Sequence, residues 1–281
     1  MREFRGNVAV VTGAASGMGR AFAERFAAEG MRVVLADVEA PALEQAVATL
    51  RQQGHEALGV PTDVSRLDEV QRLAQTVVER YGAVHLVCNN AGVDGYLDGP
   101  IWEATDRDWQ WTFGVNLWGV VHGVRTFLPL MLDQDADGYL VNTASATGLV
   151  QANNMYGITK HAVVAFSEVV YSQLAQREAR VGISVLCPGV VNTRLFEAAR
   201  NRPAALRNAQ PSAAAAAGAE LRARMIERLA LAMPPARVAD ILLEAIRREQ
   251  FYVLTDAEWD ARIEARHTAI MQRGNPSLPA R

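Results

Sequence analysis

The chain has 281 residues, with 28 basic and 31 acidic side chains and a formal net charge of -3 at pH 7. Half of its residues are hydrophobic, which is enough for a globular protein with a sizeable core and excludes a disordered chain. No basic run is long enough to follow a nucleic-acid backbone, so nucleic acid is not an expected partner.

No segment reaches the ~18 consecutive apolar residues of a membrane span, and the first residues lead into a strand-like segment rather than a signal peptide. We therefore expect a cytoplasmic protein that makes no membrane contact. Cys88 and Cys187 lie in apolar strand-like segments, which is typical of buried thiols, and the five histidines show no ligand spacing. No metal site is expected.

A short β-branched run at 7–11 predicts the first strand, and apolar periodicity at 20–29 predicts the first helix. The glycines of the turn between them have the spacing Gly-x-x-x-Gly-x-Gly. Glycines permit a tight turn and the close approach of a diphosphate, while free N–H groups at the helix start supply partial positive charge. The alternative is a purely structural turn. The residues expected to bind a dinucleotide here are Gly13, Ser16, Gly17, Met18 and Gly19.

The second strand is expected at 32–36, with Asp37 at its C-terminal end. In a βαβ nucleotide-binding unit this position faces the adenosine ribose. A carboxylate there accepts hydrogen bonds from both ribose hydroxyls and repels a 2′-phosphate, and neither Ala15 nor Val38 supplies a cation. Asp37 therefore favours NAD over NADP, although an aspartate at a strand end can also be a turn former.

The third strand is followed by Asp63 and Val64, within reach of an adenine ring. Asp63 could equally cap the next helix, and the two roles are compatible. The fourth strand leads into Asn89 and then Asn90, Ala91 and Gly92, whose small and amide side chains leave room for a ligand and supply hydrogen bonds. The expected helices in this part of the chain are 40–53 and 66–81, and the expected strands are 56–61 and 84–88.

A long helix is expected at 105–132 and contains Asn116, which has weak helix propensity and is therefore expected to hydrogen-bond to a partner. The fifth strand, at 138–143, precedes Ser145. A helix at 154–177 carries Tyr156 and Lys160.

Tyr156 and Lys160 are four residues apart and lie on one face of their helix. A free phenol has a pKa near ~10 and is a poor base at neutral pH. A positive charge at about 4 Å is worth roughly 4 kcal/mol at an effective dielectric near ~20, enough to lower a pKa by up to about 3 units. The pair predicts a phenol that exchanges protons near pH 7, unless it is simply a chance pair on a solvated helix.

The remaining strands are expected at 181–186 and 251–255, with helices at 234–248 and 259–272. Strands that alternate with helices predict an α/β protein: a Rossmann-type doubly wound parallel sheet of about seven strands. We expect one domain at 1–255 and a C-terminal helical extension at 256–281. Segment 194–233, with its alanine run, interrupts the alternation and is expected to be a helical lid or else a solvated insertion.

Together, the glycine-rich turn, Asn89-Asn90-Ala91-Gly92, Ser145, Tyr156-x-x-x-Lys160 and Pro188-Gly189-x-Val191-x-Thr193 resemble the short-chain dehydrogenase/reductase family. The resemblance covers about residues 5 to 255. It implies an NAD-dependent oxidoreductase that interconverts a secondary alcohol and a ketone by hydride transfer. An NADP-dependent carbonyl reductase and a catalytically silent NAD-binding sensor or scaffold are the alternatives.

The resemblance also implies a role for each motif residue. Tyr156 would be the general acid/base, Lys160 would hold the nicotinamide ribose and lower the phenol pKa, Ser145 would orient the substrate oxygen, and Asn116 would hold a relay water. The nicotinamide carboxamide would be bound by Pro188, Gly189, Val191 and Thr193. The loop between Ser145 and Tyr156 is slightly shorter than is common in the family.

The expected substrate is a small hydrophobic or aromatic alcohol or ketone, because the candidate pocket residues are mostly apolar. Some of them could instead fill the core. Helices 105–132 and 154–177 carry more apolar residues than one core-facing stripe needs, and in this family such helices form dimers or tetramers. The candidate substrate-binding residues, besides Ser145 and Tyr156, are Tyr96, Leu149, Met155, Leu195 and Phe196.

Overall fold

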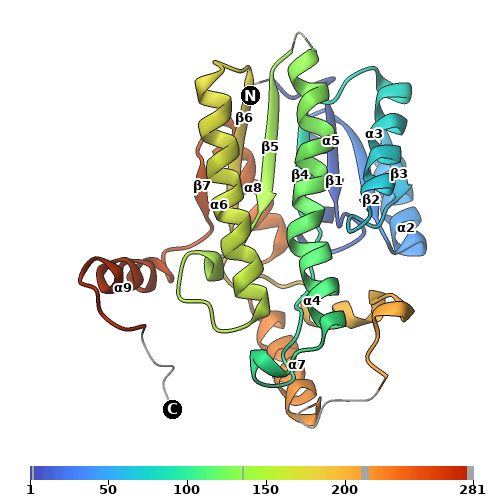
Figure 1. Ribbon diagram of the computed structural model, residues 1–281. Coiled ribbons are helices and arrows are strands. Elements are labelled where there is room, and N and C mark those ends of the chain that lie inside the picture. The colour runs from blue at the N-terminus through green and yellow to red at the C-terminus, as the bar shows by residue number, and fades with distance from the viewer. Residues whose placement is uncertain (2, 135, 210–214, 277–281) are drawn as a thin grey trace.

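A parallel seven-stranded sheet with the strand order β3-β2-β1-β4-β5-β6-β7 forms the centre of the computed structural model, which describes residues 1, 3–134, 136–209 and 215–276 (Figure 1). The predicted Rossmann-type fold is confirmed. The alanine run lies partly outside the described residues, as does the end of the extension. The strands are β1 (Val8–Thr12), β2 (Arg32–Asp37), β3 (Ala57–Pro61), β4 (Leu86–Asn89), β5 (Gly138–Thr143), β6 (Val181–Cys187) and β7 (Tyr252–Leu254).

Helices cover both faces of the sheet. None of those in the described ranges is long and hydrophobic enough to cross a lipid bilayer. The α-helices are α1 (Gly17–Ala28), α2 (Ala40–Gln52), α3 (Leu67–Tyr81), α4 (Asp106–Phe113), α5 (Gly119–Asp133), α6 (Met155–Gln176), α7 (Ala215–Ala230), α8 (Pro235–Arg247) and α9 (Asp260–Met271). Short 3₁₀ turns occur at η1 (Ile101–Glu103), η3 (Ala146–Gly148), η4 (Leu195–Asn201) and η5 (Ala204–Leu206).

Strand β1 shows why the sheet has two helical layers. Its side chains alternate between the faces: Ala9 and Val11 join the apolar cluster that includes α1, α2 and α8, while Val8 and Val10 join the cluster that includes α3, α5 and α6. All four residues are fully buried. A strand buried on both faces reads as a continuous apolar run, as expected for a parallel sheet whose strands all end at the same edge.

The predicted helix at 105–132 is interrupted by a π-helical turn, η2 (Gly114–Trp118). Asn116 lies in this turn and is completely buried. Its Oδ1 accepts a hydrogen bond from the Val93 N–H at 2.8 Å, and its Nδ2 donates to the Val93 carbonyl at 3.0 Å. The expectation that Asn116 hydrogen-bonds to a partner is confirmed, and its partner is the backbone after β4. π-turns of this kind occur frequently at functional sites.

A buried chain of polar side chains lies behind the carboxyl edge of the sheet. Asn89 of β4 donates to Asn142 of β5 at 2.9 Å, and Asn142 donates to Ser167 of α6 at 3.0 Å. Gly123 of α5 packs directly against the amide of Asn89. A side chain at position 123 would therefore displace the first member of this chain.

We predict that Gly123→Ala destabilises the protein by about 1–3 kcal/mol through overpacking. The new Cβ would lie 1.9 Å from Asn89 Oδ1. The matched control is Gly114→Ala, whose Cβ would lie 3.4 Å from its nearest neighbour in a helical backbone. Urea unfolding of both variants measures the effect. Equal midpoints for native protein and Gly123→Ala would contradict the prediction.

Candidate active site

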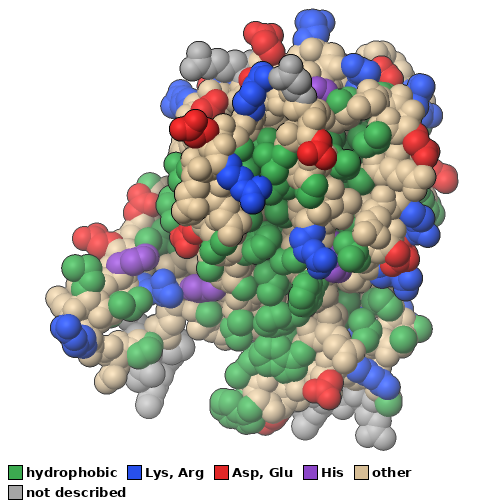
Figure 2. Space-filling view, turned by 45° about the horizontal axis from the view of Figure 1, so that its top comes forward, with side chains coloured by type: hydrophobic (Ala, Val, Ile, Leu, Met, Phe, Trp, Pro, Cys, Tyr) green, Lys and Arg blue, Asp and Glu red, His purple; other side chains and the backbone are tan. Residues whose placement is uncertain are grey.

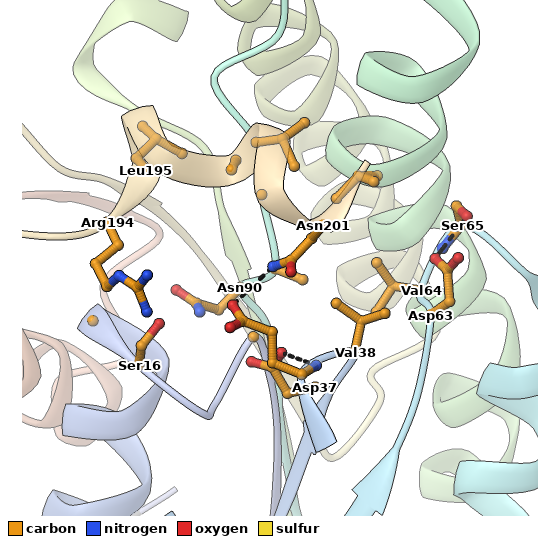
Figure 3. Close-up of a pocket in the computed structure, with 18 of the residues that line it drawn as sticks. Ser16, Asp37, Val38, Asp63, Val64, Ser65, Asn90, Arg194, Leu195 and Asn201 are labelled. Atoms are coloured by element: carbon orange, nitrogen blue, oxygen red, sulfur yellow. Dashed lines mark hydrogen bonds between the residues drawn. The ribbon is translucent and has the colours of Figure 1, made fainter. Parts of the chain in front are cut away.

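A pocket at the carboxyl ends of the strands collects residues from both halves of the sheet (Figure 3). It encloses about 1240 Å³ of empty space, part of which is open to solvent. The predicted residues that line it are Gly13, Ser16, Gly17, Met18, Asp37, Asp63, Val64, Asn90, Ala91, Gly92, Tyr156, Lys160, Thr193 and Leu195. These residues come from segments that are distant in the sequence.

The glycine-rich turn is built for close approach. Gly13 and Gly17 have positive φ values of 64° and 55°, which favour glycine. A Cβ on Gly19 would lie 2.2 Å from the Gly13 carbonyl oxygen. Gly19 therefore does not line the pocket but lets the start of α1 pack against the turn. Ser16, Gly17 and Met18 at the start of α1 line the pocket, and the first N–H groups of a helix have no partner within it, as an anion-binding site requires.

Each oxygen of the Asp37 carboxylate accepts a hydrogen bond from a backbone N–H group. Its Oδ2 accepts from the Ala15 N–H at 2.9 Å and its Oδ1 accepts from the Glu39 N–H at 3.0 Å. Burial raises the pKa of Asp37 above its usual value, and these two N–H groups oppose that rise. The carboxylate thus links the end of β2 to the glycine-rich turn, at the place where sequence reasoning put the adenosine ribose.

Asp63 does not cap helix α3, and that alternative is wrong. The residue preceding the helix is Arg66, which makes no side-chain cap. Asp63 Oδ1 instead accepts from the backbone and the hydroxyl of Ser65, at 3.0 and 2.7 Å. An aspartate bonded to the residue two positions on forms a local turn, which here shapes the pocket wall.

Tyr156 and Lys160 lie on the first turns of α6, which begins after Asn154. The Asn154 side chain caps the helix by accepting from the Gly157 N–H at 2.8 Å. Lys160 is the only lysine in the chain and is 2% exposed. Its Nζ donates to the Thr143 carbonyl at 2.8 Å and lies 5.4 Å from the centre of the Tyr156 ring. The predicted pair therefore exists, with its ammonium fixed by the end of β5.

The predicted pKa of the phenol is wrong for the protein alone. Burial raises the pKa of Tyr156 to about 12, and the facing Ser145 hydroxyl opposes the rise only in part. Burial also lowers the pKa of Lys160 to about 8. Sequence reasoning counted the attraction between the two groups but not the loss of water around both, which disfavours each charged form.

Ser145 follows β5 and is 7% exposed. Its Oγ accepts from the Thr147 N–H at 3.2 Å and donates to the Pro188 carbonyl at 3.4 Å. The loop after β6 is held in turn by the Gly189 N–H, which donates to Thr255 Oγ1 at 3.0 Å. Ser145, which faces Tyr156, is thus held by the loop after β6, but Ser145, Pro188 and Gly189 do not line the pocket.

The candidate substrate residues are not gathered in one place. Leu195 lines the pocket, whereas Met155 is fully buried and Leu149 packs against a small core cluster. Tyr96 is 5% exposed, and its hydroxyl has no hydrogen-bond partner among the described residues. The other predicted residues outside the lining are Asn116, Val191 and Phe196.

Sequence reasoning missed lining residues that lie just before α2, in α4, at the end of β5 and in the segment after β6. Glu39 follows Asp37 by two residues, so its nearness could have been noticed. Segment 194–206 falls in the expected lid, but no local signal singles out Arg194, Arg200 or Asn201, because these side chains reach the pocket only through tertiary folding. The missed residues include Glu39, Trp111, Thr143, Arg194, Arg200 and Asn201.

These features fit a dinucleotide. One continuous pocket lining includes Asp37, the glycine-rich turn, Lys160 and Tyr156. Asp37 would hold the adenosine ribose, the glycine-rich turn the diphosphate, and Lys160 the second ribose beside Tyr156. A sequence profile of the short chain dehydrogenase family matches residues 7–204.

The chain belongs to the short-chain dehydrogenase/reductase family. A short-chain dehydrogenase/reductase from Burkholderia phymatum, crystallised in complex with NAD, shares 45% identity and superposes with a TM-score of 0.95 over 100% of both chains. The CLA biosynthesis dehydrogenase/reductase of Lactiplantibacillus plantarum is 31% identical over 99% of this chain and 98% of its own length. The 1-deoxy-11-beta-hydroxypentalenate dehydrogenase of Streptomyces arenae is 40% identical over 67% of this chain and 68% of its own.

Membership makes this protein an oxidoreductase that binds a nicotinamide dinucleotide and acts on hydroxyl or carbonyl groups of small molecules. The predicted family and enzyme class are confirmed.

We predict that the ammonium of Lys160 titrates near pH 8 in the folded enzyme, because burial disfavours its charged form. Labelling lysine with ¹³C at Cε gives a single side-chain signal to follow by NMR, since there is one lysine. The urea-unfolded protein is the control and should titrate near ~10.4. A folded-state midpoint at the unfolded value would show that the ammonium is solvated.

Proposed function

We propose that this enzyme uses NAD to interconvert a secondary alcohol and a ketone, with Tyr156 as the general acid/base. The observation that carries the proposal is that one pocket joins Asp37 and the glycine-rich turn to Tyr156 and Lys160. A site that only bound a dinucleotide would have a use for Asp37, the glycine-rich turn and the Lys160 ammonium, but not for a buried phenol beside that ammonium.

When bound, NAD would supply the hydride acceptor and a positively charged ring that favours the phenolate. The Tyr156 hydroxyl would give its proton to the carbonyl oxygen in reduction, or take one from the alcohol in oxidation. With a pKa of about 12 in the protein alone, the phenol is protonated at neutral pH and ready to act as the acid. Ser145 would orient the substrate oxygen by hydrogen bonding.

Asn116 and Lys160 both approach the position that a Cβ on Gly92 would take, and their closeness there supports a proton path between them. A Cβ on Gly92 would lie 3.4 Å from Asn116 Oδ1 and 3.6 Å from Lys160 Nζ. Asn116 Nδ2 also donates to Thr159 at 3.2 Å. We propose that a water held by Asn116 passes protons between Lys160 and solvent. The carboxamide of the nicotinamide would be bound by Pro188, Gly189, Val191 and Thr193.

For the substrate we propose a small hydrophobic or aromatic alcohol or ketone. The support is the apolar wall formed by Val93, Trp111 and Ala198, against which Leu206 and Val115 pack. The S. arenae relative, by its name, dehydrogenates a hydroxyl-bearing pentalenate. Leu195 contributes to the same pocket, whereas Tyr96, Leu149, Met155 and Phe196 stay candidates only.

We also propose the domain organisation expected from the sequence: a catalytic domain at 1–255, a lid at 194–233 and an extension at 256–281. Residues 210–214 of the lid and 277–281 of the extension lie outside the described part. Helix α7 buries only Gly218 and Leu229, and α9 buries none of its residues. Both helices therefore bury few apolar side chains against the rest of the protein.

A homodimer or homotetramer is proposed from the face formed by α4, α5 and α6. Hydrophobic side chains gather on this face of the molecule (Figure 2). Trp118 is 49% exposed, Val169 54% and Tyr171 49%, which is unusual for large apolar residues on a solvated surface. A second copy would cover them.

We predict that Tyr156→Phe lowers kcat by at least about 10²-fold, because the proton donor at the substrate oxygen is lost. The dissociation constant for NAD, measured by calorimetry, should change less than about threefold. The matched control is Tyr252→Phe, whose hydroxyl bonds to Glu168 away from the pocket. Substantial remaining turnover would mean that another group carries the proton.

A further prediction concerns cofactor choice: the native enzyme should prefer NAD to NADP, since Asp37 would face a 2′-phosphate with a like charge. Asp37→Ala should narrow the NAD:NADP ratio of kcat/KM by about tenfold or more, equivalent to ~1.4 kcal/mol. Asp68→Ala, at an exposed carboxylate on α3, is the control. Equal use of NADPH by the native enzyme would favour the NADP-dependent carbonyl reductase instead.

A further inference from the structure

Arg194 stands on the side of the pocket opposite the glycine-rich turn. It follows Thr193 and precedes η4, and it lines the pocket with Ser16 and Gly17. Figure 3 shows its guanidinium directed toward Ser16, at the start of α1. A cation here faces the same space as the free N–H groups of the helix.

The guanidinium of Arg194 uses only some of its hydrogen-bond donors. Its Nε and Nη2 both donate to the same oxygen of Glu197, at 3.1 and 2.9 Å. Its Nη1 makes no hydrogen bond to any described residue. The Arg194 side chain is 48% exposed and Glu197 is 39% exposed, so this pair is weak and exchangeable. An anion of higher charge could compete for the arginine.

The segment that carries Arg194 is anchored across the pocket. Glu39, at the start of α2, accepts hydrogen bonds from Arg200 Nε at 3.0 Å and from Asn201 Nδ2 at 2.8 Å. Arg200 Nη1 also donates to the Arg194 carbonyl at 3.3 Å. Burial pushes the pKa of Glu39 upward, but its bonds to Arg200 and Asn201, with the charge of Arg194 nearby, bring it below its usual value. The C-terminal end of η4 is thereby held by Glu39, and Arg200 links this end to the backbone of Arg194.

We infer that Arg194 binds the diphosphate of the cofactor, from the side opposite the start of α1. The inference rests on the proposed dinucleotide function. Asp37 marks the adenosine end of the pocket and Lys160 the nicotinamide end, so the diphosphate belongs between them, beside Gly13 and Gly17. The N–H groups of the turn supply only partial positive charge, whereas a guanidinium offers full charge and a planar fork that matches phosphate.

The segment from Arg194 to Asn201, called the strap below, would thus hold the diphosphate in the pocket from one side. Glu39 fixes one end of η4 near the adenosine ribose, which leaves Arg194 at the other end within the pocket. Without a bound ligand Arg194 pairs with Glu197, and a bound diphosphate would replace Glu197 as its partner. This role differs from that of Thr193, which is proposed to bind the carboxamide.

The test is direct binding of two ligands by calorimetry at low salt. ADP-ribose contains the diphosphate, and adenosine lacks it. Arg194→Gln should weaken ADP-ribose binding by about 10- to 100-fold, the range for a charge-assisted hydrogen bond, and leave adenosine binding within about twofold. The salt dependence of ADP-ribose binding should become shallower in the variant. Arg224→Gln, at an exposed arginine elsewhere in the proposed lid, is the matched control.

Unchanged ADP-ribose binding in Arg194→Gln would overturn the inference. So would an equal loss for adenosine, because it would mean that Arg194 only supports the strap. If Arg194→Gln does not fold, Arg194→Lys replaces it as the test variant. It keeps the charge but lacks the paired N–H donors of the guanidinium, and it must still weaken binding of ADP-ribose more than binding of adenosine. Failure of the native protein to bind ADP-ribose would instead reject the proposed function, and neither ligand depends on turnover by Tyr156.

Discussion

The buried ammonium of Lys160 is the constraint on which the active-site region depends. A charge removed from water is costly unless it is hydrogen-bonded, and here the Thr143 carbonyl at the end of β5 supplies the bond. Independently of this charge, Gly148 lies against the backbone of α6: a Cβ on Gly148 would lie 2.7 Å from the Lys160 carbonyl oxygen. The Ser145 loop can therefore rest directly on α6. The Lys160 ammonium fixes the end of β5 relative to α6, and the Gly148 contact fixes the loop relative to the same helix.

The same burial sets the protonation of the two central side chains in opposite directions. It favours neutral Tyr156 and makes Lys160 easier to deprotonate, but with a pKa of about 8 the ammonium still carries its charge at pH 7. Charge at the phenol then depends on what binds beside it. A neutral phenol suits a group that is proposed to carry a proton. A permanently ionised phenolate would carry the free-energy cost of a buried charge even when no ligand is bound beside it.

The sheet could be predicted from the sequence because each strand is an apolar run such as that of β1 and each helix has its own period. The positions of Asp37, Tyr156 and Lys160 followed, since strand ends and helix faces are local properties. The π-turn at Asn116 could not be predicted, because its cause is the backbone of Val93, 23 residues away. Glu39 and Arg200 are 161 residues apart and meet only in the folded chain.

The contacts of the proposed lid cannot be predicted from the pattern of apolar residues in the sequence, because charged side chains make them. The lid is pinned by ion pairs: Arg202 Nη1 donates to Asp108 at 2.7 Å, and Arg222 Nε donates to Asp94 at 2.9 Å. Both carboxylates are almost fully buried, so their partners are costly to remove but specific in position. A segment held this way can open without exposing a large apolar surface to water, because water replaces the lost partners of each charge. A lid fixed by leucines instead would expose that surface each time the pocket opened, and would hold its ligand at the expense of turnover.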